Sequence, residues 1–276
     1  MQKLKNLFFS FLVILLMGSC GEYNKVLNKG LNADRYKLAV DLYEKGDYKK
    51  AIPLFEKLVG PYSGKPQMER IQFMMSNSYY NTEDYALSSY YFSKFIVNYP
   101  ESSKVQESAY LSAKSYFLAT PKYSKDQQDT YKALTAFQSF IDKYPTSDLI
   151  PEANKYYEEL NIKLEKKYFE IAKQYYHTEK YNAAIVAFDT FNEEYLGSQF
   201  KEEALFIRFK SAYELGMQSI LSKKEERLGN AKFAYSKFNR SFPESEYKND
   251  ADKMLTDIEE ELTKIKERYA KISQGG

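Results

Sequence analysis

One phrase recurs along the chain and sets the spacing of any fold that it can adopt. A ring, a second ring three residues later, an aromatic-proline pair and a serine occur as FSKFIVNYPESS from Phe92, FQSFIDKYPTS from Phe137 and YSKFNRSFPES from Tyr235. FDTFNEEYLGS from Phe188 keeps the spacing without the proline. Rings three residues apart share one face of a helix, and proline ends a helix because it lacks the amide hydrogen. The sequence therefore predicts four helices that end in the same way.

The distances between these helix endings are those of a helical repeat array. When Phe55 is added to the series, successive first rings lie 37, 45, 51 and 47 residues apart, which are periods of helical solenoids. A small residue precedes each ring by four positions, in the pairs Ala51/Phe55, Ser88/Phe92, Ala133/Phe137, Ala184/Phe188 and Ala231/Tyr235. From residue 33 onward, apolar and small residues keep helical spacing. We expect an all-α fold.

The small-then-aromatic spacing resembles that of tetratricopeptide repeats, whose units are pairs of helices, here called helix A and helix B. It predicts a solenoid of five helix pairs over residues 33–247, with repeats at about 33–65, 66–103, 104–148, 152–199 and 201–247. In residues 248–276, apolar positions from Ala251 to Tyr269 alternate spacings of four and three along a charged helix. This stripe should cap the last repeat, although a partner helix could dock on it instead.

The first twenty residues have the pattern of an export signal. Two lysines precede an apolar run from Leu7 to Met17, which is too short to span a bilayer. The ending Met17-Gly18-Ser19-Cys20 resembles a bacterial lipobox, which implies removal of residues 1–19 and acylation of Cys20, palmitate included. The alternative is an ordinary cleavage site that a cysteine happens to follow. Residues 20–32 are polar, and we expect them to be a lipid-anchored tether.

Composition argues against several classes of function. The 40 basic side chains include Lys3 and Lys5, so removal of residues 1–19 leaves 38 against 38 acidic ones, and no nucleic-acid partner is expected. With one histidine, His177, and one cysteine, neither a usual zinc site nor a Cys-His nucleophile can be assembled. No glycine-rich phosphate loop is evident. We expect no enzyme activity, no metal and no cofactor beyond the lipid on Cys20.

Two rows of rings on the A helices predict a peptide-binding groove. The rows, seven residues apart, are Tyr36, Phe73, Tyr110 and Phe169, and then Tyr43, Tyr80, Phe117 and Tyr176. Asn77 and Lys114 fall between the rows and could meet backbone carbonyls or a terminal carboxylate. Such a face would suit an extended peptide with aromatic side chains. Alternatively, the rings fill the inside of the superhelix. We do not extend the rows into the fifth repeat, because Lys210 stands where a small residue is expected.

The chain after residue 19 resembles the BamD family of outer-membrane protein assembly lipoproteins. The resemblance rests on the lipobox, the five repeats, and the phrases DQQDTYKALTAFQSFIDKYPTS from Asp126, KYNAAIVAF from Lys180 and EEALFIRFKSAYELG from Glu202. It implies a lipid-anchored outer-membrane protein that faces the periplasm. It also implies that such a protein binds the barrel subunit BamA, chiefly through C-terminal repeats, and joins other subunits of the assembly machine. Its N-terminal repeats would receive unfolded outer-membrane proteins, whose C-terminal signal ends in an aromatic residue.

Two other readings of the sequence remain open. Periplasmic scaffolds of the Tol-Pal coordinator type also have repeats with aromatic-Tyr-Pro-Ser endings, but they usually place a coiled coil before the repeats and lack a lipobox. A glycan-binding surface lipoprotein with helical repeats would use the same exposed rings. An outward export signal after Cys20 is not evident.

Overall fold

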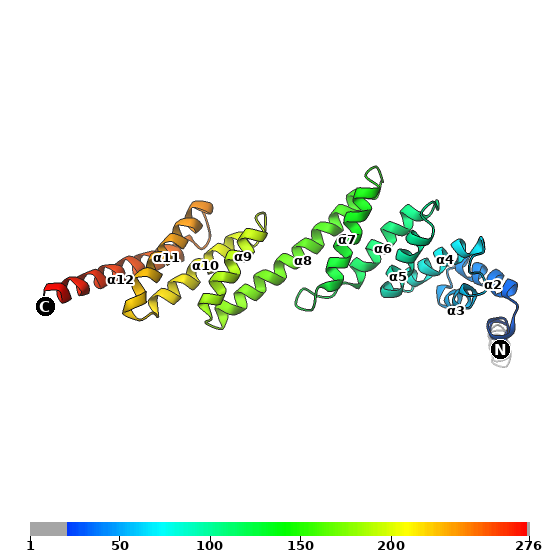
Figure 1. The fold of residues 1–276 in the computed structure, drawn as a ribbon, viewed down its shortest axis with the longest axis horizontal. Coiled ribbons are helices and arrows are strands. Elements are labelled where there is room, and N and C mark those ends of the chain that lie inside the picture. The colour runs from blue at the N-terminus through cyan, green and yellow to red at the C-terminus, as the bar shows by residue number, and fades with distance from the viewer. Residues whose placement is uncertain (1–20, 275–276) are drawn as a thin grey trace, which may run out of the picture. The chain divides into compact units, whose positions relative to one another are not determined.

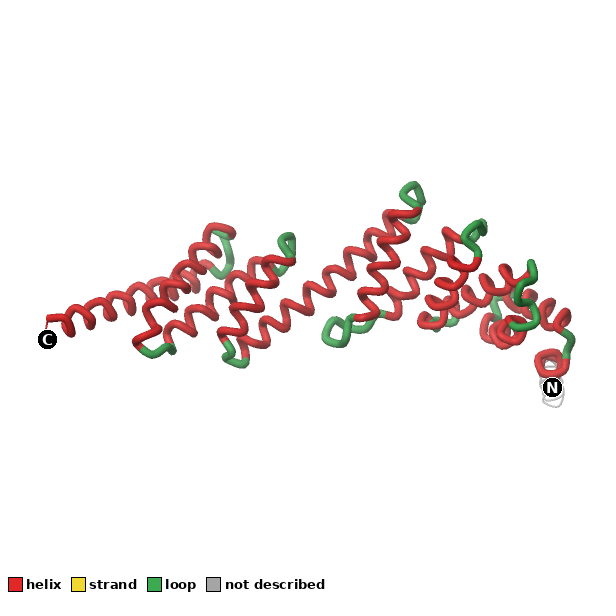
Figure 2. Tube along the Cα trace, viewed as in Figure 1, coloured by secondary structure: helices red, strands yellow, loops and turns green. Residues whose placement is uncertain are grey.

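The computed structural model describes residues 21–274, and within that range every regular element is a helix, joined to the next by a short loop (Figure 2). The expectation of an all-α fold is confirmed. Residues 21–29 are helical, and the helices that follow (Figure 1) are α2 (Asn32–Glu44), α3 (Tyr48–Val59), α4 (Gln67–Asn81), α5 (Tyr85–Asn98), α6 (Val105–Ala119), α7 (Gln128–Lys143), α8 (Ile150–His177), α9 (Tyr181–Glu194), α10 (Lys201–Met217), α11 (Leu221–Ser241) and α12 (Lys248–Gln274).

The helices alternate as A and B helices of five pairs, from α2 and α3 to α10 and α11, with α12 last. They form two compact units. Unit 1 comprises residues up to 121 together with 126–160, and unit 2 comprises residues 122–125 and those from 161 onward. Helix α8 contributes its first turns to unit 1 and the remainder to unit 2. Each unit has its own hydrophobic core.

A tight turn joins helix A to helix B in three of the pairs. One residue in each turn adopts a left-handed conformation: Gly46 (φ 77°), Glu83 (φ 62°) and Glu179 (φ 58°). The next amide then donates to a carbonyl five residues back, as from Asp47 to Leu42 at 2.8 Å, which closes the C-terminal end of helix A. The third and fifth pairs lack this turn. In the third pair the inserted residues lie in the connection 120–127, whereas in the fifth pair the connection is only residues 218–220 and α11 is 21 residues long.

The recurring phrase does two jobs in the structure. Its two rings are buried, as with Phe92 and Phe95 in α5, except that Tyr235 in the last copy is only partly buried. Its serine begins the next repeat, because the hydroxyl oxygen accepts a hydrogen bond from the amide two residues on. These bonds are Lys104 to Ser102 at 3.0 Å, Leu149 to Ser147 at 3.3 Å, Phe200 to Ser198 at 3.1 Å and Tyr247 to Ser245 at 3.1 Å. The copy without proline therefore makes the same turn as the others.

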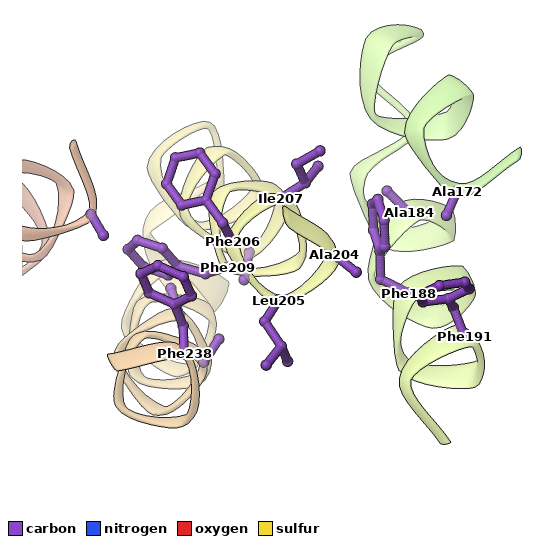
Figure 3. Packing of buried hydrophobic residues seen from close by; sticks show 14 of the residues in the cluster. Ala172, Ala184, Phe188, Phe191, Ala204, Leu205, Phe206, Ile207, Phe209 and Phe238 are labelled. Carbon is purple, nitrogen blue, oxygen red and sulfur yellow. The ribbon is translucent and has the colours of Figure 1, made fainter. Parts of the chain in front are cut away.

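Unit 2 illustrates how small and large residues alternate across the pairs (Figure 3). Ala204 of α10 faces Ala184 and Phe188 of α9, whereas Phe209 on the same helix lies beside Phe238 of α11. All five side chains are fully buried. The alanines let the helices approach, and the rings fill the space that remains.

The N-terminal segment differs from expectation. Residues 21–29 form a helix rather than a tether, and Tyr23, Val26 and Leu27 pack against the first core cluster of unit 1. The Tyr23 hydroxyl donates to the backbone carbonyl of Lys50 at 3.0 Å. Three apolar side chains at helical spacing were enough to dock this segment, although its overall composition is polar. Residues 1–20 lie outside the described residues, so the export signal and the acylation of Cys20 stay predictions.

Helix α12 packs on α10 and α11, which confirms the expectation of a C-terminal cap. Ala251, Ile258 and Ile265 are buried in the core of unit 2. The buried part of the stripe ends there, since Tyr269 is exposed. None of the helices within residues 21–274 is long and apolar enough to cross a membrane.

The rings of the recurring phrase should contribute strongly to stability. Phe92→Ala is expected to lower the free energy of unfolding by about 3–5 kcal/mol, because it removes a fully buried ring and leaves a cavity. Tyr90→Ala on the same helix is the matched control, and its effect should stay within about 0.5 kcal/mol because that ring is exposed. Urea denaturation followed by circular dichroism measures both. Equal losses would contradict the assignment of the phrase to the core.

Candidate functional site

The second row of rings lies near the ends of the A helices and stays partly exposed. In unit 1, Tyr43 meets Tyr48 edge-on with ring centroids 5.5 Å apart, and Tyr80 meets Tyr85 in the same way at 5.9 Å. Phe117 instead packs on Tyr156, with centroids at 4.4 Å. In unit 2, Tyr176 repeats the pattern against Tyr181 at 5.9 Å. Each ring is thus held from one side by the core and is open on the other.

The first row lies mostly in the core, which favours the alternative that these rings fill the inside of the array. Phe73, Tyr110 and Phe169 are only 9%, 5% and 2% exposed. Phe73 packs edge-on against Phe92 and Phe95, with centroids 6.1 and 5.8 Å away. These side chains lie in the middle of their A helices, where they pack against the rings of helix B. In this row, only Tyr36 remains partly exposed, stacked on Tyr62 at 5.7 Å.

A cleft of about 480 Å³ in unit 1 joins one ring from each row. Met74 and Phe95, with Phe73, supply buried apolar surface to it. Its remaining lining residues are Tyr43, Glu44, Pro66, Glu69, Arg70 and Lys104. The volume is within the usual range of ligand pockets. We call it the α2–α4 cleft.

Two cations stand at the α2–α4 cleft. The Arg70 guanidinium lies 3.2 Å from the carboxylate of Glu44, and both side chains are well exposed. The Lys104 ammonium lies 5.2 Å from the centre of the Phe73 ring. Burial, followed by the proximity of Tyr48 and Glu107, raises the pKa of Tyr43 to about 12, so its hydroxyl remains protonated. The rings could pack against an aromatic side chain of a ligand, and the exposed cations could bind a carboxylate near that side chain.

Lys114 is not the free donor that the sequence suggested. Its ammonium is 3.0 Å from the carboxylate of Glu152, and the side chain is mostly buried between the rings of Tyr110 and Tyr156. The Tyr156 hydroxyl also donates to Glu152, at 2.9 Å. The nearby Tyr110 hydroxyl, the Lys114 ammonium and the Tyr156 hydroxyl together lower the pKa of Glu152 to about 2. This cluster fastens α8 to α6 within unit 1.

Asn77, the other polar residue predicted between the rows, is partly exposed and bonded along its own helix. The side-chain amide of Asn81 donates to the backbone carbonyl of Asn77 at 2.8 Å and also contacts its side-chain oxygen. Its side-chain nitrogen is the group that remains for a ligand. Of the predicted residues, therefore, the structure brings Tyr43 and Phe73 together in one cleft and places Tyr80 near Lys114.

Sequence reasoning missed several residues of this face. Arg70 and Lys104 belong to no sequence motif. They line the cleft only because of the way in which the helices pack together. The continuation of the rows into the fifth repeat was visible: Phe206 and Tyr213 follow Phe169 and Tyr176 by the same 37 residues that separate the earlier members. Lys210 likewise follows Lys173 by 37 and belongs to the polar row, with its ammonium 5.5 Å from the Tyr176 ring.

Comparison with known proteins places this architecture in a family. The family model described as "YfiO: Outer membrane lipoprotein" matches residues 29–228, which include α2 to α10 and the start of α11. This chain belongs to that family.

Two curated proteins that are similar to this chain are named outer membrane protein assembly factor BamD. The protein from Caulobacter vibrioides is 24% identical over 222 residues, 80% of this chain and 70% of the relative. The protein from Rickettsia prowazekii is 26% identical over 231 residues, 83% of this chain and 92% of the relative. The resemblance to the BamD family is thereby confirmed. Both names describe an assembly factor rather than an enzyme.

The paired Glu152 should make stability depend on pH. Its pKa is about 2 in the folded state against an ordinary 4.5, so its stabilising contribution is complete above pH 4.5 and is lost as the pH falls toward 2. Because the carboxylate is partly exposed, Glu152→Gln should cost only about 0.5–1 kcal/mol at pH 7. Denaturant titrations from pH 7 to 3 should show this difference shrinking below pH 4.5. Glu159→Gln, exposed on the same helix, is the control; a pH-independent loss for Glu152→Gln would contradict the prediction.

Proposed function

We propose that this protein is a non-enzymatic, lipid-anchored subunit of the machinery that assembles β-barrel proteins in the outer membrane, and that it faces the periplasm. The observation that carries the proposal is the family match over residues 29–228, which includes most of both units. The names of the two relatives point to the same activity. Anchoring rests on acylation of Cys20, as the lipobox predicts.

Within this function, unit 1 receives the unfolded substrate at the α2–α4 cleft. An aromatic side chain inserts between Tyr43 and the edge of Phe73, where it gains apolar contact against rings that are already ordered by the core. A carboxylate at the end of the substrate bonds to Arg70, displacing the exposed Glu44. Exchange is inexpensive because exposed ion pairs contribute little. Lys114 is unsuited to this role, since its carboxylate partner is held by two further groups.

Unit 2 carries a second surface that fits the scaffolding of a BamA-type barrel subunit. A cleft of about 430 Å³ is formed by α9, α10 and α11. Phe233 of α11 lines it and is 70% exposed, an unusual position for a phenylalanine. Arg208 also lines it, and its guanidinium donates to both carboxylate oxygens of Asp189 at 3.0 Å, which fixes α10 to α9. An exposed ring beside a fixed arginine offers the aromatic and guanidinium groups that commonly anchor protein interfaces.

Substrate binding can be tested with a peptide that ends in phenylalanine and a free carboxylate. Tyr43→Ala with Arg70→Ala should weaken its affinity about tenfold, because both the ring contact and the charge-assisted bond are lost. Fluorescence anisotropy of the labelled peptide measures this. Amidation of the peptide's C-terminus should weaken binding to the wild-type chain and change little for Arg70→Ala.

The control for this experiment is the double variant Tyr90→Ala with Lys132→Ala, which removes an exposed ring and an exposed cation elsewhere in unit 1. It should bind as the wild-type chain does. If the Tyr43 and Arg70 variant keeps its melting temperature and its affinity, the α2–α4 cleft is not the substrate site.

The scaffolding role predicts that Phe233→Ala reduces the amount of barrel subunit that co-purifies with the lipidated protein from native membranes. An aromatic anchor at an interface commonly contributes about 2 kcal/mol or more, so a severalfold reduction is expected. Leu196→Ala is the control, because that side chain is also exposed and belongs to the same unit. Undiminished recovery with Phe233→Ala would exclude this surface from the interface.

A further inference from the structure

The docked helix at residues 21–29 changes how the protein can sit relative to its anchor. A flexible tether of twelve residues would let unit 1 stand about 20 Å from the lipid. In the structure, Gly21, the residue that follows Cys20, is already helical. Neighbouring Cα atoms are about 3.8 Å apart. An acylated Cys20 would therefore bring the first turn of this helix directly to the bilayer surface.

Two hydrogen bonds fix residues 21–29 to the rest of unit 1. The Tyr23 hydroxyl donates to the Lys50 carbonyl at 3.0 Å, and the Arg35 guanidinium donates to the Leu27 carbonyl at 3.2 Å. Gly30 then allows a sharp change of direction, because a Cβ there would lie 2.6 Å from the Val26 carbonyl oxygen. Reorienting the helix would require these contacts to break, so the anchor also orients unit 1.

The face of the helix that points away from unit 1 has the chemistry of a membrane-contacting surface. Lys25 and Lys29 are exposed one helical turn apart, opposite the packed face of Tyr23 and Val26. Leu31 follows at the start of α2 and is 73% exposed. Basic side chains close to an exposed apolar residue are attracted by an anionic phospholipid surface.

We propose that Lys25, Lys29 and Leu31 form a membrane-contacting face that seats unit 1 directly on the phospholipid surface beside its lipid anchor. The proposal rests on the acylation of Cys20 in the proposed function. It does not depend on the assembly activity. The partner is the bilayer itself: the lysines contact lipid phosphates, and Leu31 enters the interfacial region. Unit 1 is thereby held at the membrane in a set orientation instead of moving freely around its anchor.

The only cysteine in the chain is Cys20, so in the lipidated protein an introduced cysteine is the single site for a fluorescent label. Leu31→Cys and the control Val97→Cys, which replaces an equally exposed apolar residue on α5, are labelled with nitrobenzoxadiazole. Each full-length lipidated protein is placed in vesicles of phosphatidylethanolamine and phosphatidylglycerol that contain a spin-labelled headgroup lipid. Strong quenching at position 31 and weak quenching at 97 is the expected result. Equal quenching at the two positions would overturn the proposal.

Charge reversal tests the role of the lysines. In the Leu31→Cys background, Lys25→Glu with Lys29→Glu should lower quenching about twofold or more, and neutral phosphatidylcholine vesicles should do the same. Lys57→Glu with Lys155→Glu, exposed elsewhere in unit 1, should leave it unchanged. Equal effects of the two double variants would overturn the membrane-contacting face.

Mass spectrometry of the N-terminal peptide separates this inference from its premise. An acylated Cys20 without quenching at position 31 overturns the membrane-contacting face and leaves the anchor in place. An unmodified Cys20 overturns the anchoring and this inference with it. Either result is independent of whether the substrate peptide binds at the α2–α4 cleft.

Discussion

The close approach of helix A to helix B within each pair is the interaction on which the rest of the structure depends. It is permitted by the small residue four positions before each helix B ring, and all five of these residues, namely Ala51, Ser88, Ala133, Ala184 and Ala231, are fully buried. Serine serves at one of them only because its hydroxyl finds a partner in Ser115 at 2.8 Å. A larger side chain at any of these positions would separate the helices and unseat the ring behind it.

This packing also decides which aromatic side chains are left for function. Helix B rings fill the space between pairs and pack against rings from the middle of the A helices. Phe73 and Tyr110 are therefore core residues. Rings about two turns later lie at the edge of that space: Tyr43 and Tyr80 each meet a tyrosine of the next helix and stay partly exposed. The position of a ring along helix A therefore decides its role. Rings at the edge of the space between the helix pairs are not fully buried and remain accessible to a ligand.

Much of the fold could be read from the sequence because its cause is periodic. Recurrence of one phrase predicted the helix pairs, and an apolar stripe at helical spacing predicted the cap. A constant offset of 37 residues could have placed Phe206 and Lys210 as well. The docked N-terminal helix escaped notice because three apolar residues give little periodic signal. The pair of Lys114 with Glu152 was also invisible, because 38 residues separate the partners and they lie on different helices, α6 and α8. A contact that occurs only once between two helix pairs leaves no periodic pattern in the sequence.

Electrostatic contacts between successive A helices follow the same logic and end where the array ends. Lys114 reaches Glu152 at the start of the next A helix, and Lys173 reaches Glu203 in the same way at 2.8 Å. For Lys210, the equivalent acidic position is Asp250, which instead lies 3.7 Å from Lys253 on its own helix. The first turn of α12 carries Lys248, whose ammonium pairs with Asp252. Because the carboxylate at that position of α12 pairs with a lysine of its own helix, the series of pairs between A helices stops at the helix that also ends the hydrophobic core.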